Sequence, residues 1–173
     1  MKTIFVINVK QYSYHKRILE FLAEAAKKYG EVQVFDMSEN IPLHEQYYRL
    51  QEAGADFLVS FDCAGFELRT ENNTLSYNHF GCRMAHLLFR HREEYREALR
   101  QQMNFSMFVF SVKEKDVLFL QKHLPNIPNA EWLEIPEGIK QTGQEGLADK
   151  ESECFRWAEK WFSYIIKEAE LNF

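Results

Sequence analysis

Short apolar runs alternate along the chain with longer segments in which every third or fourth residue is apolar. The first pattern is typical of buried strands and the second of amphipathic helices. Their alternation predicts β-α-β units around a mostly parallel sheet. We expect strands over 3–9, 31–36, 56–62, 74–78, 105–110 and 132–135, and helices that begin near residues 14, 42, 81, 111 and 150.

Three of these helices follow from clear apolar stripes. In the first, Ile18 and Leu22 share a face, and Gly30 is expected to end the helix because glycine commonly follows the last turn. The segment 81–101 has a stripe that runs from Met84 to Leu99. The closing helix, about 150–171, repeats apolar residues at spacings of three and four. These residues are Phe155, Ala158, Phe162, Ile165 and Ala169.

Six strands separated by helices predict one three-layer, doubly wound Rossmann-like domain over residues 1–173, with a polar loop near 138–147 before the closing helix. We expect the strand order 3-2-1-4-5-6, which puts the topological switch point between the first and fourth strands. Ligands of such sheets bind outside the carboxyl ends of the strands at that point. The candidate site residues are Asn8, Lys10 and Tyr12 after the first strand, Asp62 after the third, and Asn78 and His79 after the fourth.

His79 and Asp62 are the candidate catalytic residues, because either side chain could remove a proton from a hydroxyl group. The ordinary pKa of histidine suits this role, and His79 precedes a predicted helix N-terminus, where anions are favoured. The other four candidates could hold a ligand, Lys10 through a phosphate and Tyr12 by stacking on a sugar. The alternative is structural, with His79 a surface residue and Asp62 the cap of a turn.

The residues after the first predicted strand argue against the common cofactors. The turn 9–15 contains no glycine, whereas the dinucleotide-binding fingerprint needs glycines there so that the backbone can approach a pyrophosphate. The chain also contains no GxxxxGK[ST] segment. We therefore expect no bound cofactor.

We expect no metal site either. Asp62 lacks the acidic neighbours after the first strand that a magnesium-dependent phosphoacceptor site would need. His79, Cys82 and His86 are only three nearby ligands, whereas structural zinc takes four. Cys82 and His86, four apart on a predicted helix, could instead pair as nucleophile and base. A buried thiol beside a histidine is the simpler interpretation.

Composition narrows the classes of protein further. The chain is 46% apolar and 15% aromatic, which excludes intrinsic disorder. Its 26 acidic residues outnumber the 21 basic ones, so a nucleic acid partner is not expected. Three cysteines without a CxxC pair indicate reduced thiols and a cytoplasmic location. Since no apolar run approaches the roughly 20 residues that cross a bilayer, membrane insertion is not expected.

Four segments resemble a known family in the order of their strands and in the residues at the strand ends. They are 55–62 (ADFLVSFD), 75–79 (LSYNH), 108–111 (FVFS) and 133–138 (LEIPEG). Over residues 1–138 the chain resembles the N-terminal Rossmann-like half of two-domain, GT-B-type glycosyltransferases, especially the spore-maturation type. In that family the donor is held mainly by a C-terminal domain, so the resemblance implies either an acceptor-side fragment of a longer enzyme or a standalone domain that kept the fold and lost donor binding. A C-terminal transferase domain would then be a partner, and the chain would not be catalytic alone.

The sequence thus predicts a glycosyltransferase-like domain that binds a small polar or sugar-like ligand in the switch-point crevice. The alternative is a non-catalytic interaction or sensor domain that acts through a homodimer or partner interface. In that case Trp157, Trp161 and Tyr164 of the closing helix would be exposed and form the interface, because aromatic residues are favoured there.

Overall fold

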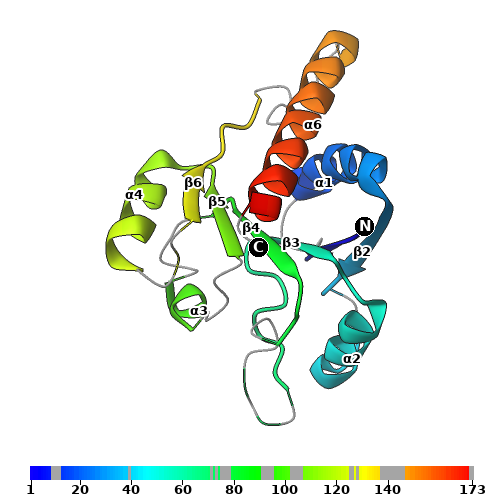
Figure 1. Cartoon of the computed structure of the whole chain (residues 1–173), viewed down its shortest axis with the longest axis vertical. Helices are drawn as coiled ribbons and strands as arrows, with labels where there is room; N and C mark the ends of the chain where they lie inside the picture. Colours follow the sequence, from blue (N-terminus) through cyan, green and yellow to red (C-terminus); the bar gives the residue numbers. More distant parts are fainter. Residues whose placement is uncertain are drawn as a thin grey trace.

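The computed structural model describes residues 1–8, 13–38, 40–70, 72, 74, 79–90, 96–101, 107–124, 127, 129–136 and 147–171. Figure 1 shows a layer of strands with helices on both sides. The strands are β1 (Lys2–Ile7), β2 (Glu31–Asp36), β3 (Phe57–Phe61), β4 (Arg83–Leu88), β5 (Met107–Ser111) and β6 (Asn129–Trp132). The helices are α1 (Ser13–Ala26), the 3-10 turn η1 (Lys27–Tyr29), α2 (Leu43–Ala53), α3 (Arg96–Arg100), α4 (Glu114–His123) and α6 (Leu147–Leu171).

All six strands pair in parallel in one sheet, so the predicted α/β class with a mostly parallel, Rossmann-like sheet is confirmed. The expected strand order is wrong: the sheet runs β2-β1-β3-β4-β5-β6. All five residues of β3 are buried, whereas β2 is exposed or half-buried along its length. A strand that is apolar on both faces belongs inside a parallel sheet. β3 therefore pairs with β1, and the switch point lies between these two strands.

The segment 83–88 is a strand and not the start of a long helix. Met84 and Leu88 fit a helical stripe, but they are also alternate positions of a strand and point to the same side of the sheet. Pairing with β3 on one side and β5 on the other decides between the two patterns. Within the described residues of the predicted helix, the helical part is α3. The strand expected at 74–78 falls mostly outside the described residues, and β6 begins three residues earlier than expected.

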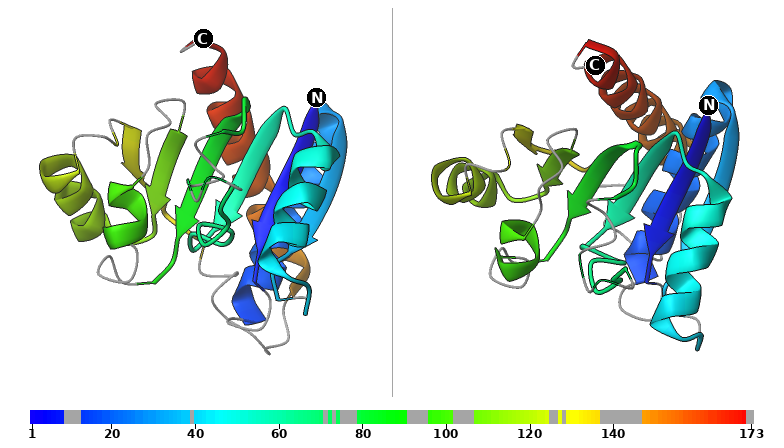
Figure 2. Two further views of the ribbon diagram at one scale, coloured as in Figure 1. Left: turned by 90° about the horizontal axis from the view of Figure 1, so that it is seen from below. Right: turned by 60° about the horizontal axis from the view of Figure 1, so that its bottom comes forward.

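Helices lie on both faces of the sheet (Figure 2). A cluster of buried hydrophobic residues lies between the sheet and the helices on each face. On one face α1 and α6 pack on the sheet through residues such as Ile18, Leu22 and Phe162. On the other face lie α2, α3, α4 and the turn that follows β3, with Leu50 and Leu120 buried among them. The predicted apolar faces of the first and last helices are thus the faces that the sheet buries.

Gly30 holds the junction between η1 and β2, and its replacement is expected to be costly. Its φ and ψ are 144° and -148°, a region that is essentially restricted to glycine and costs other residues about 1–3 kcal/mol. A Cβ there would also lie 2.1 Å from the carbonyl oxygen of Met1. We expect Gly30→Ala to lower the free energy of unfolding in urea by at least that amount. Gly81→Ala is the matched control, since a Cβ at Gly81 meets nothing within 4 Å; equal losses in both variants would contradict the expectation.

Candidate functional site

The switch point of the sheet lies between the carboxyl ends of β1 and β3. After β1 the chain continues through Asn8 towards α1, which covers one face. After β3 it turns through Cys63 and Phe66, which are buried on the opposite face. Because α1 and the turn after β3 lie on opposite faces of the sheet, this edge is the place where a doubly wound sheet opens a crevice for a ligand.

Asp62 links β3 to β4 at this edge. Its backbone amide donates to the carbonyl of Leu87 at 2.8 Å, which extends the strand pairing by one residue. Its carboxylate Oδ1 accepts the amides of Phe89 at 2.7 Å and Arg90 at 3.3 Å. With its side chain only 3% exposed, Asp62 holds the end of β4 in place. This geometry corresponds to the turn-cap interpretation of Asp62.

Arg90 is the residue at this edge that sequence reasoning missed. Its Nε lies 3.6 Å from Oδ2 of Asp62, and its Nη2 donates to the carbonyl of Asp62 at 3.3 Å. The side chain is 23% exposed, so the guanidinium is fixed by the protein and still reaches solvent. The signal in the sequence was an arginine soon after an apolar run. It was hidden because 81–101 was predicted to be one helix.

Asn8 provides a second polar group at the same edge. It directly follows β1 and is half-buried. Its side-chain Oδ1 is buried and accepts no hydrogen bond from the described residues. An amide oxygen without a donor is costly to bury, so a hydroxyl or amine of a ligand would be a favourable partner for it. Three other candidates, Lys10, Tyr12 and Asn78, lie outside the described residues.

His79 belongs to a different part of the fold from Asp62. It lies four residues before the amino end of β4, whereas Asp62 follows the carboxyl end of β3. The sequence prediction that both residues follow strands at one edge rested on a strand at 74–78 and a helix from 81. The imidazole is exposed, and its Nε2 lies 2.8 Å from Oγ1 of Thr74, which in turn is 2.7 Å from Oγ1 of Thr70. These contacts tie the connection before β4 together.

Cys82 and His86 are not neighbours in space as a helix would make them. Residues four apart in a strand are separated by about 13 Å, compared with about 6 Å on a helix. His86 lies inside the protein with its ring edge-to-face on Phe66 at 4.8 Å, and burial lowers its pKa to about 3. Burial raises the pKa of Cys82 to about 11, so its thiol stays protonated at neutral pH. Among the described residues no group of three acidic, histidine or cysteine side chains could hold a metal ion.

Of the three aromatic residues of α6 that were expected to be exposed, Tyr164 is exposed, whereas Trp157 is half-buried and Trp161 is buried. Trp161 is only 6% exposed and packs edge-to-face on Phe110. Trp157 donates to the carbonyl of Glu134 at 2.9 Å, and the Tyr164 hydroxyl lies 2.7 Å from the Glu131 carboxylate. These residues therefore attach α6 to β6 and the segment after it.

None of the helices in the described part of the chain is long and apolar enough to cross a membrane. α6 is 25 residues long, but charged residues such as Glu151, Lys160 and Lys167 occur along it. No protein-family model, no curated protein and no solved structure matches the chain. A proposal about function therefore rests on the polar groups at the carboxyl ends of β1 and β3.

Proposed function

We propose that the chain is a glycosyltransferase-like acceptor-side domain that binds a small polar, sugar-like ligand at the carboxyl edge between β1 and β3. The observation that carries this proposal is the pair of polar groups beside the switch point. One is the Asn8 amide oxygen, which accepts no hydrogen bond from the described residues, and the other is the Arg90 guanidinium held by Asp62. A crevice in this position is where doubly wound sheets bind their ligands.

The two groups have complementary chemistry towards a sugar. The Asn8 oxygen accepts a hydrogen bond from a hydroxyl, and the Arg90 guanidinium donates to a hydroxyl or phosphate oxygen. Because Asp62 already holds the guanidinium, little side-chain entropy is lost when a ligand binds. A side chain that is already held in place before the ligand arrives allows the ligand to bind through few contacts.

Asp62 acts in this proposal as a positioning residue. Its Oδ1 accepts two backbone amides, and its Oδ2 faces Arg90. If the Asp62 carboxylate took a proton from a ligand, it would lose some of the hydrogen bonds through which it holds the end of β4. His79 precedes the other end of β4. The transfer step therefore needs groups from a C-terminal transferase domain, as the family resemblance implies, and the chain is a binding domain when alone.

Thermal unfolding with a panel of monosaccharides, disaccharides and UDP-glucose tests the proposal. A ligand at ten times its Kd adds about 1.4 kcal/mol of stability, which raises the Tm of a domain of this size by about 3–5 °C. We expect at least one sugar to produce such a shift, and Arg90→Ala to abolish it.

Arg100→Ala, on the exposed side of α3, is the control and should retain the full shift. Arg90→Lys, which keeps a cation, should retain part of it if the effect is due to ligand contact rather than misfolding. A panel in which no member shifts the Tm, or a shift that is unchanged in Arg90→Ala, would overturn the assignment.

A further inference from the structure

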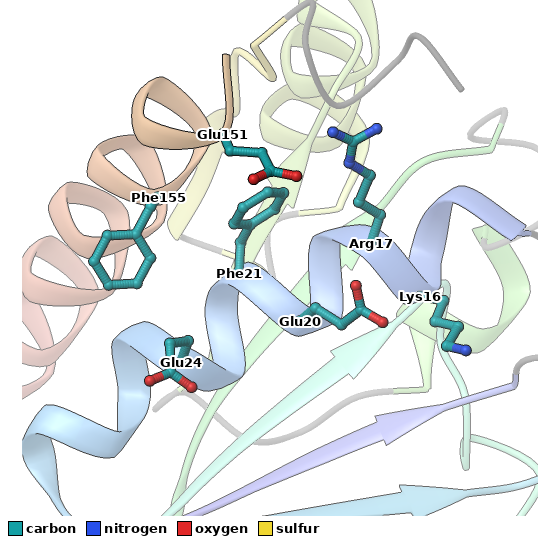
Figure 3. A pocket seen from close by; sticks show the side chains of 7 residues that line it. All are labelled: Lys16, Arg17, Glu20, Phe21, Glu24, Glu151 and Phe155. Atoms are coloured by element: carbon teal, nitrogen blue, oxygen red, sulfur yellow. The ribbon is translucent and has the colours of Figure 1, made fainter. Parts of the chain in front are cut away.

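The outer sides of α1 and α6 form a groove on the face of the molecule away from the sheet (Figure 3). Two open depressions, of about 530 and 380 Å³, follow one another along it. Residues near the start of α1 face residues near the start of α6 in the first, and later residues of both helices meet in the second. The two helices therefore run in the same direction, and we call the surface between them the α1–α6 groove.

The floor of the groove is aromatic. Phe21 and Phe155 project into it from the two helices and are only partly buried (Figure 3). The Arg17 guanidinium lies 6.0 Å from the ring of Phe21, and the Lys28 ammonium lies 5.5 Å from the ring of Phe155. Contacts between cations and aromatic rings become stronger when they are removed from water, as they would be when a partner covers them.

The two ends of the groove differ in the sign of their charge. Three carboxylates, Glu20, Glu24 and Glu151, line the first depression against two cations, Lys16 and Arg17. Glu24 is also paired with Lys27, so Glu20 and Glu151 carry the acidic character of this end. In the second depression cations outnumber the single carboxylate, which is paired with Lys28. Arg156 and Lys160 there are four apart on α6 and repel each other, which costs the isolated helix stability. An acidic partner group would relieve that repulsion.

The shape of the groove fits a macromolecular partner better than a small molecule. Small-molecule sites typically enclose most of the ligand surface, whereas both depressions are shallow and open. The α6 residues that line the two depressions, from 151 to 163, extend for about 20 Å. An interface of the standard size, roughly 800 Å² per partner, would therefore also include the flanks of both helices. The opposite flank of α6 is already attached to β6.

We propose that the α1–α6 groove is the interface of a homodimer in which two copies pack groove to groove in opposite directions. A two-fold axis brings the same surface of both copies together, so the surface must complement itself. The groove meets this requirement, because its acidic end would face the basic end of the second copy at both contacts. Phe21 and Phe155, which line the acidic depression, are then buried in the interface together with the charged side chains around them.

Reversal of the charges at each end tests this arrangement by analytical ultracentrifugation from about 1 to 500 µM at low salt. We expect the wild-type chain to form a dimer that weakens as salt is raised, since screening acts on rim charges. The double variants Glu20→Lys/Glu151→Lys and Arg156→Glu/Lys160→Glu should each raise the dimer Kd at least tenfold. An equimolar mixture of the two variants should restore a dimer, because opposite charges again face each other.

Glu153→Lys/Lys167→Glu is the matched control, since both residues are exposed on α6 outside the groove, and its dimer Kd should stay within threefold of the wild type. Circular dichroism of every variant checks that α6 still forms. A wild-type chain that is monomeric up to 500 µM overturns the proposal, and the groove then belongs to another partner. A dimer that neither reversal weakens, or a mixture that does not restore it, also overturns it.

Discussion

Replacement of Phe162 by alanine is expected to lower the free energy of unfolding by about 4 kcal/mol, the cost of a phenylalanine-to-alanine truncation in a packed core. Phe162 is fully buried where α6 meets the sheet. Its ring lies 6.0 Å from that of Phe57, 6.5 Å from Phe5 and 5.5 Å from Tyr29. One side chain therefore joins α6 to β1, β3 and the end of η1, and its removal leaves a cavity that rigid strands cannot fill.

Urea unfolding followed by circular dichroism measures this loss. Phe162→Leu should lose less free energy of unfolding, because leucine keeps most of the side-chain volume. This variant replaces the alanine variant in the measurement if the alanine variant does not fold. Ser163→Ala changes the next, exposed residue and should stay within about 0.5 kcal/mol of the wild type. A loss below 1 kcal/mol for Phe162→Ala would mean that α6 does not depend on this contact with the sheet.

Acid is expected to destabilise the protein through His86. Burial lowers the pKa of this imidazole from 6.5 to about 3 in the folded chain. As the pH falls below 6.5, the unfolded chain binds a proton that the folded chain does not, so the stability present at neutral pH is lost down to pH 3. The contribution lost by pH 5 is about 2 kcal/mol, at about 1.4 kcal/mol per pH unit.

The His86→Leu variant isolates this contribution, because leucine fills a similar volume and does not titrate. The difference in unfolding free energy between pH 7.5 and pH 5.0 should be about 2 kcal/mol smaller in this variant than in the wild type. His123→Gln, at an exposed position of α4, should leave the pH dependence unchanged. Identical pH dependence in His86→Leu and the wild type would show that folding does not lower the pKa of His86.

The same burial excludes His86 from proton transfer in a reaction at neutral pH, since a general base works best with a pKa near the operating pH. The candidate ligand groups, Asn8 and Arg90, lie at the carboxyl edge, while the histidine of β4 is a core residue against Phe66.

Part of the candidate site could be predicted from the sequence. Asn8 and Asp62 follow apolar runs that are strands, and both lie at the carboxyl edge as expected. The structure places His79 before β4, whereas it was expected after a strand at 74–78, most of which lies outside the described residues. Arg90 was not predicted, for one reason. The apolar residues of 83–88 fit both a helical stripe and a strand, and a short run of this kind does not distinguish them.

The chain by itself determined which segments have apolar faces, and hence the α/β class and the surfaces of α1 and α6 that the sheet buries. Those features depend on local periodicity, which each segment carries alone. Only the tertiary structure decided that β3 lies between β1 and β4 and that 83–88 is a strand. Pairing in a parallel sheet joins residues that are far apart in sequence, and its energy depends on the neighbouring strand. The position of the switch point, and with it the pairing of Asp62 and Arg90, is therefore a property of the assembled sheet.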